Sequence, residues 1–267
     1  MSAGTLQGTT TSLQGAITNN ASVSFNQAGN GTYAGAMSGS GAVTVTGGGT
    51  VTFSGANSYL GGTTVSGGST LAISANNNLG AGSSALTLSG GTLQTTATLG
   101  MTRGITLTGT GTIQTATGTT MISDGAVGGT GNLVKSGDGV LIVTADNTYA
   151  GTTTVSAGTL QVGNGGTTGT LGGGAVTNNA QLTFNRSNGV TVANNIGGTG
   201  AVTVQGGGTV TLTGTNSYGG GTTVSGAGTT LGVAGNTALG TGALSLGNGT
   251  TLQAAADGVT LGNAVSL

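Results

Sequence analysis

The chain has 267 residues, of which 61 are Gly, while only 3% are charged and 3% are aromatic. Pro, Cys, His and Trp are absent, and the formal net charge is −1. This composition excludes a nucleic-acid surface and a basic lipid-binding surface, which both need clustered Lys and Arg, and it excludes a Ser-His-Asp triad.

The composition still favours an ordered fold. Gly-rich chains can be disordered, but 34% of these residues are apolar and they recur periodically. The longest apolar stretch, Val140–Val143, is far shorter than the roughly 20 residues of a membrane-spanning helix. The opening stretch, Met1–Gly15, has no basic or apolar segment of the signal-peptide kind, so no signal peptide is expected in this chain.

Short strands are predicted along the whole chain. In 201–204, 209–213 and 229–233, Val or Leu alternates with Thr or Gly, which is the pattern of a half-buried strand. Clusters of Gly, Asn and Ser end each strand after three to five residues. No stretch has the apolar spacing of an amphipathic helix, so almost no helix is expected.

The sequence repeats itself at two scales. Residues 16–26 match 175–185, and residues 41–59 match 200–218, both with an offset of 159. A shorter motif recurs around Tyr59, Tyr149 and Tyr218. Its spacing predicts about 12 coils of about 22–23 residues, and the long unit predicts one continuous solenoid made of residues 1–155 and an incomplete second copy, 156–267.

A parallel β-solenoid is favoured over an antiparallel sandwich. A sandwich needs no such period, whereas a solenoid stacks equivalent positions about 4.8 Å apart. In this arrangement Thr faces outward, Val and Leu face inward, and Gly or Asn turns the corners. Stacked Asn side chains are expected to bond in ladders, and the motif Tyr is expected to cover a corner with its hydroxyl in water. Tyr33, Tyr59, Tyr149 and Tyr218 could alternatively form a sugar-stacking stripe.

At Gly206–Val233 the chain resembles the autotransporter-associated β-strand repeat, also called the passenger-associated transport repeat. Further copies stand near 47–73 and 137–162, and together they cover about a third of the chain. The resemblance implies a right-handed β-helix from a bacterial surface protein that is secreted through the outer membrane. It implies adhesion more often than catalysis. The signal peptide and the C-terminal translocating barrel of such proteins are not expected in this chain.

The charged residues form a short inventory: Arg103, Asp124, Lys135, Asp138, Asp146, Arg186 and Asp257. Lys135, Asp138 and Asp146 share one motif copy, which is compatible with a small catalytic or cation site. Corner charges with a weak surface ion pair are the favoured interpretation. No catalytic, cofactor-binding or metal-binding residue is expected, and no cofactor.

Other candidate sites have simpler explanations. The strings 128–133 and 197–202 begin like a calcium repeat, but Leu133 and Val202 stand where the carboxylate ligand belongs. Glycosylation-like sequons are expected to be turn residues; they begin at Asn20, Asn30, Asn185 and Asn248.

Three functions fit the sequence. The first is a non-enzymatic cell-surface segment, an adhesin passenger or stalk in attachment, autoaggregation or biofilm, located outside the cell. Its partners would be other copies of itself, a host or cell surface, or a polysaccharide, with no nucleic acid and no membrane insertion. The alternative is a subunit that polymerises end to end into a fibre. The third is ice binding, because Thr-x-Thr recurs at 44–46, 50–52 and 209–211.

Overall fold

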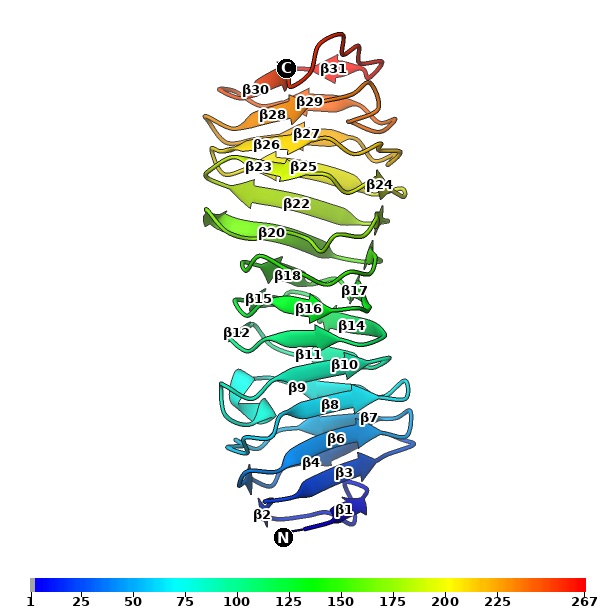
Figure 1. Ribbon diagram of the computed structural model, residues 1–267, viewed down its shortest axis with the longest axis vertical. Coiled ribbons are helices and arrows are strands. Elements are labelled where there is room, and N and C mark those ends of the chain that lie inside the picture. Colours follow the sequence, from blue (N-terminus) through cyan, green and yellow to red (C-terminus); the bar gives the residue numbers. More distant parts are fainter. Residues whose placement is uncertain (1–2) are drawn as a thin grey trace.

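The chain winds into a column of stacked turns. A computed structural model describes residues 3–267, so residues 1–2 of the predicted solenoid lie outside the described part. The turns stack along one axis, with the two ends of the chain at opposite ends of the column (Figure 1). Every strand pairing in the described part is parallel, and there are about 13 turns. The predicted all-β parallel solenoid is confirmed.

Each turn visits three sides in the same order, and we refer to these sides as walls. The first wall holds a seven-stranded sheet and, nearer the C-terminus, a four-stranded sheet. The seven strands are β1 (Thr5–Gly8), β3 (Ser22–Asn26), β6 (Ala42–Thr46), β8 (Thr63–Ser66), β10 (Leu86–Ser89), β13 (Ile105–Leu107) and β16 (Val127–Gly129). The four are β23 (Val190–Val192), β26 (Thr209–Leu212), β28 (Thr230–Val233) and β30 (Thr251–Ala254).

The second wall is one nine-stranded sheet. Its strands are β4 (Gly31–Tyr33), β7 (Thr50–Phe53), β9 (Thr70–Ile73), β11 (Thr92–Thr95), β14 (Thr110–Thr115), β17 (Asn132–Ser136), β19 (Thr153–Val155), β21 (Val176–Asn178) and β24 (Ile196–Gly197).

The third wall begins with the pair β2 (Ile17–Thr18) and β5 (Met37–Ser38) and continues as a second nine-stranded sheet. That sheet consists of β12 (Leu99–Met101), β15 (Thr120–Ser123), β18 (Val140–Val143), β20 (Thr159–Gly166), β22 (Gln181–Arg186), β25 (Ala201–Gln205), β27 (Thr222–Val224), β29 (Leu244–Leu246) and β31 (Val265–Ser266). Between β5 and β12 the same wall carries the short 3-10 helix η1 (Asn76–Leu79). Among the described residues, no helix has the length and apolar character to span a membrane.

The alternating pattern places apolar side chains inside the column. In β6, Val43 and Val45 are fully buried while Thr44 between them is half-exposed. Near the N-terminus the core also holds three rings, Phe25, Tyr33 and Phe53, packed edge to face at 5.2–6.0 Å between ring centres. Because each turn buries its inner face only against its neighbours, the column is stabilised by repetition.

Glycine is required at equivalent corners of the repeats. Gly47 and Gly206 have positive φ angles of 97° and 104°. A Cβ atom would also lie 2.5–2.6 Å from an Asn side-chain oxygen of the turn below, that of Asn26 or Asn185. Both the conformation and the close approach therefore exclude a side chain there.

The motif copies lie on three different walls. The turn below Tyr59 is β5, below Tyr149 it is β16, and below Tyr218 it is β24, and these strands belong to three different sheets. The 90 residues from Tyr59 to Tyr149 thus make four and one-third turns, and the next 69 make three and one-third. A turn is therefore about 21 residues long, since strand partners are mostly 20 to 22 residues apart. This is slightly shorter than predicted, because the prediction assumed whole numbers of turns between copies.

Candidate functional site

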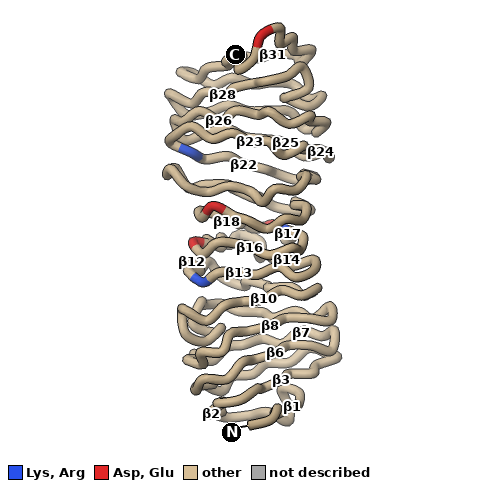
Figure 2. Tube along the Cα trace, in the orientation of Figure 1, with Lys and Arg blue, Asp and Glu red and all other residues tan. Residues whose placement is uncertain are grey.

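The charged side chains are sorted between the inside and the outside of the column. All three basic residues are buried: Arg103 and Arg186 are 2% and 4% exposed, and Lys135 is fully buried. The four acidic residues are exposed at corners: Asp124, Asp138, Asp146 and Asp257. Figure 2 shows that these few charges are spread over the upper two-thirds of the column. Among the described residues, no group of three or more acidic residues could hold a metal ion.

Lys135 lies in the wall of the column, so the prediction of a corner charge is wrong. It belongs to β17, where it stacks in register between Ile113 below and Val155 above. Its ammonium donates to the carbonyl oxygens of Ser136, Gly137 and Ala157, at 2.8, 2.6 and 3.1 Å. Burial lowers the pKa of Lys135 to about 8, and the charge of nearby Asp138 partly opposes this shift. The ammonium has carbonyl partners in place and therefore fastens two turns together.

Asp146, the third member of the predicted charged group, is directed elsewhere. Its side-chain oxygen accepts a hydrogen bond from the backbone of Gly169, in the next turn, at 3.0 Å. Asp138 is exposed and accepts from Thr117 at 3.3 Å. The three residues therefore have separate hydrogen-bond partners.

The two arginines hold loops. Arg103 donates hydrogen bonds of 2.7–3.3 Å to four residues of the turn below, Asn76, Leu79, Gly80 and Ser84. The first two of these residues belong to η1. Burial lowers the pKa of Arg103, and Tyr59 partly offsets the effect.

Arg186 bonds in a similar way to the loop at residues 167–169, which follows β20. It donates to the carbonyl oxygens of Gly169 and Thr167 and to the side chain of Asn188. Both side chains therefore satisfy carbonyl groups that the strands leave free.

One Asn in each repeat copy fastens three consecutive turns. Its side-chain oxygen accepts from a backbone N–H of the turn below at 2.7–2.8 Å, and its nitrogen donates to a carbonyl of the turn above at 2.5–2.7 Å. The three are Asn57, Asn147 and Asn216, which are 4–7% exposed. The predicted side-chain ladder is wrong for these residues, because each bonds to backbone groups instead.

The motif Tyr lies two residues after this Asn, and its side chain points inward. Each Tyr is fully buried, and its hydroxyl shares a hydrogen bond with the hydroxyl of the Thr four residues on, at 2.6–2.7 Å. The pairs are Tyr59–Thr63, Tyr149–Thr153 and Tyr218–Thr222. Burial raises the pKa of Tyr59 and of Tyr218 to about 12. The prediction of a wet hydroxyl is therefore wrong, and full burial removes these three rings from any sugar-stacking stripe.

Tyr33, the fourth tyrosine of the predicted stripe, is only 1% exposed. Its hydroxyl donates to the carbonyl of Gly15 at 2.7 Å. It is a core residue of the first turns, and it is no more available to a sugar than the motif tyrosines.

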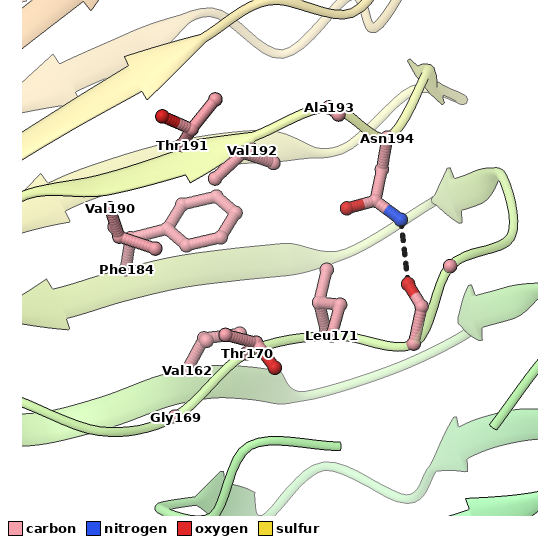
Figure 3. Close-up of a pocket in the computed structure, with 12 residues that line it drawn as sticks. Val162, Gly169, Thr170, Leu171, Phe184, Val190, Thr191, Val192, Ala193 and Asn194 are labelled. Carbon is pink, nitrogen blue, oxygen red and sulfur yellow. Dashed lines mark hydrogen bonds between the residues drawn. The ribbon is translucent and has the colours of Figure 1, made fainter. Parts of the chain in front are cut away.

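A partly open cavity of about 220 Å³ lies in the first wall, next to the loop that Arg186 holds. Its floor is apolar and its rim is polar, as Figure 3 shows. The floor is made by Val162, Leu171, Phe184, Val190 and Val192, and the rim includes Thr170, Thr191 and Asn194. No charged residue lines it.

A family model of the passenger-associated-transport-repeat matches residues 43–73, 133–162 and 202–231, and each range contains one of the Asn and Tyr–Thr sets. The chain carries three passenger-type repeats on one parallel β-solenoid. The predicted copies are confirmed. In each copy, the polar side chains of the motif join neighbouring turns of this chain.

A longer relative supports the same assignment. The Adhesin BmaC autotransporter of Brucella suis biovar 1 (strain 1330) is 42% identical over 74 residues. These residues are 27% of this chain and 2% of that protein, so the chain spans a small part of the relative's length. No solved structure matches the chain significantly.

Several sequence patterns turn out to belong to the passenger repeat's core and corners. Leu133 and Val202, which replace the carboxylate in the calcium-like strings, are core residues with at most 1% exposure. Asn20, Asn30 and Asn248 lie outside strands as predicted.

The strand bounds and the pairing of strands bear on two other predictions, the turn position of Asn185 and the rows of Thr. Asn185 lies within β22 rather than in a turn. The paired Thr rows are interrupted, since Thr52 stacks beside Ala72 and Thr211 stacks beside Gly232. The second row of each Thr-x-Thr pair is broken at these places, whereas the row Thr44, Thr64, Thr87 and Thr106 continues in register, and the ice-binding hypothesis stays a prediction.

The cavity was not foreseen. Its only signal in the sequence is the extra residues of 163–168, which shift the register between β20 and β22. Such a bulge re-aims the residues around it, and a single sequence does not reveal what space remains.

Proposed function

We propose that the chain is a segment of a secreted bacterial surface adhesin, in which it serves as a stiff stalk or display surface. The observation that carries the proposal is the set of three passenger repeats, each interlocking three turns of one continuous column. The likeness to a relative named an adhesin autotransporter supports it. The repeats and the solenoid point to a structural role rather than an enzymatic one.

The outer faces indicate what kind of contact such a segment would make. Thr50, Thr70, Thr92 and Thr112 stack in register on the second wall, all half-exposed. The exposed charges of the described residues are the four Asp alone. Because the faces present hydroxyl and amide groups with little charge, we infer neutral partners: another copy of the chain or a polysaccharide.

Cell-surface display tests the proposal. The chain is displayed on a non-adhering bacterium through a separate anchor, and aggregation, attachment and biofilm are measured. A matched variant, Thr50→Asp with Thr70→Asp and Thr92→Asp, adds charge to one outer row while leaving the inward residues untouched. Display should increase attachment or aggregation, and the variant should reduce it. Equal attachment by displaying and non-displaying cells would count against an adhesive role.

The location outside the cell is tested separately in the native host. Antibody against the column, applied to intact cells, should label the surface, and external protease should remove the label. Labelling only after lysis would contradict the proposed location.

End-to-end assembly remains a second candidate function. Leu6 on β1 is 37% exposed and Val265 on β31 is 55% exposed, so apolar side chains face solvent at both ends of the stack. Further turns of a longer chain would cover the same edges. Electron microscopy of the purified chain distinguishes the two: fibres one column wide support assembly, and isolated short rods contradict it.

A further inference from the structure

The cavity in the first wall has an equivalent place in each repeat copy. The residue two positions after Leu79, Leu171 or Leu239 donates its N–H to the carbonyl of the motif Tyr. These three leucines are therefore structurally equivalent, one per copy. Leu79 and Leu239 are fully buried, whereas Leu171 is 8% exposed and forms the cavity floor.

The residues of the turn above differ between the first and second copies. Above Leu79, Arg103 reaches the carbonyl of Gly80; above Leu171, the equivalent Asn194 reaches the carbonyl of Gly172. Met101 lies two residues before Arg103, and Val192 lies two residues before Asn194. In the second copy both side chains are shorter than in the first, so the space that Met101 and Arg103 fill is left open above Leu171. In the third copy Asn263 bonds in the same way to the carbonyls of Gly240 and Gly242, and the longer Leu261 stands in place of Val192.

One polar atom is directed into this space. Asn194 uses its nitrogen to donate to the carbonyls of Gly172 and Gly174, at 2.8 and 2.6 Å. Its side-chain oxygen accepts no hydrogen bond from the described residues, and Figure 3 shows it on the side of Val192 and Phe184. A ligand that fits must therefore be uncharged, largely apolar and equipped with one donor.

We propose that this cavity binds a small neutral ring compound with a hydroxyl group, of the phenol or alicyclic alcohol class. The ring packs on Leu171, Phe184 and Val192, and the hydroxyl donates to the side-chain oxygen of Asn194. The volume of about 220 Å³ is sufficient, because an apolar cavity of roughly 150 Å³ holds benzene. Apolar pockets with a few placed polar groups are the usual form of small-molecule sites.

The probe for the test is p-cresol, with toluene as the matched compound that lacks the donor. Each is titrated into the methyl-labelled chain and followed by NMR. Shifts should be confined to the methyl groups that line the cavity, chiefly those of Val162, Leu171, Val190 and Val192. The affinity for p-cresol should be about threefold to tenfold higher than that for toluene, as expected for one net hydrogen bond. Absence of saturable shifts at these methyl groups, or equal affinity for both compounds, would overturn the proposal.

Variants taken from the chain's own first copy test the location. Asn194→Arg and, separately, Val192→Met should fill the cavity and weaken p-cresol binding at least tenfold. Both are checked for folding by circular dichroism, and Val192→Met remains informative if Asn194→Arg fails to fold. The control Asn164→Ala, at an exposed position near the end of β20, should bind as the parent chain does. Unchanged binding in a folded Val192→Met or Asn194→Arg variant would overturn the assignment.

The reciprocal change tests the physical cause. Arg103→Asn should open an equivalent space above Leu79 and add a second set of p-cresol-dependent shifts there. Sedimentation of the same variants tests whether a side chain of a second copy of the chain occupies the cavity instead. If Asn194→Arg alters self-association while p-cresol fails to bind, the cavity takes a side chain of a second copy and the proposal is wrong.

Discussion

The hydroxyl oxygen of Tyr149 lies 2.6 Å from that of Thr153, and both side chains are fully buried. The same pair recurs in the other two repeat copies at 2.6 and 2.7 Å. Each hydroxyl satisfies the other inside an otherwise apolar core. The fixed spacing of Tyr and Thr in the motif is therefore explained by hydrogen bonding within the core.

Tyr149→Phe should lower the free energy of unfolding by about 1–3 kcal/mol, because it leaves the Thr153 hydroxyl buried without a partner. Thr153→Val should cost a similar amount. The double variant should cost less than the sum, since neither orphaned hydroxyl remains. Thermal unfolding of the four chains measures the coupling. Strict additivity would show that the two hydroxyls do not depend on each other.

Asn147→Ala should be among the more damaging single changes in the column. It leaves the N–H of Val127 and the carbonyl of Thr170 without partners and so separates three turns, at a cost of about 2–4 kcal/mol if each orphaned group contributes about 1–2. Hydrogen exchange should become faster at the amides of β16 and of residues 170–173. Asn248→Ala, an exposed turn residue, serves as the control and should change stability by less than about 0.5 kcal/mol. Equal effects of the two changes would contradict the interlocking role.

The period-two pattern was sufficient to predict the wall strands. Val43, Val45, Val51 and Phe53 all point inward with no exposure, as alternation with Thr requires. The number of turns was predicted less accurately, because the copies are displaced by one wall around the axis. A sequence period gives the number of residues between copies. It does not show that the next copy lies on the first wall instead of the third.

The buried polar residues were harder to predict for a different reason. Their partners are carbonyl groups of neighbouring turns, which the sequence does not place. Lys135 nevertheless left one signal: it occupies the position of Val45 and Val204 in the other copies. A charge at a core position of a repeat indicates an internal partner rather than a solvated corner.

Lys135 should make stability depend on pH in a defined window. Its pKa is about 8 in the folded chain and about 10.5 when unfolded, so between these values the unfolded state binds more protons. Stability contributed by this group should therefore rise from pH 8 to pH 10.5.

Lys135→Val copies the other repeats and should remove this rise. At pH 7 the variant should be as stable as the parent chain or more stable, because a buried charge gives way to a side chain that suits the core. Urea unfolding of both chains at pH 7, 8, 9 and 10 measures the difference. Above pH 10 the buried tyrosines, whose pKa values are raised, act in the opposite direction in both chains, so the comparison is made below that point. Parallel stability curves for the two chains would contradict the prediction.

Thr95 and Thr115 should be sites where a substitution stabilises the column. They stack in register on the second wall and are fully buried, and their hydroxyls have no hydrogen-bond partner among the residues that the structure describes. Thr95 also follows Ile73 in the same inward row, where an apolar side chain is accommodated. Thr95→Val keeps the shape and removes the buried hydroxyl, so the free energy of unfolding should rise by about 1 kcal/mol.

Thr153→Val makes the same chemical change at a hydroxyl that has a hydrogen bond, so it should lower the free energy of unfolding instead. Calorimetry of the two variants beside the parent chain measures both effects. If Thr95→Val lowers the unfolding temperature as Thr153→Val does, the hydroxyl of Thr95 is bonded in solution, and a water molecule between Thr95 and Thr115 is the partner to look for.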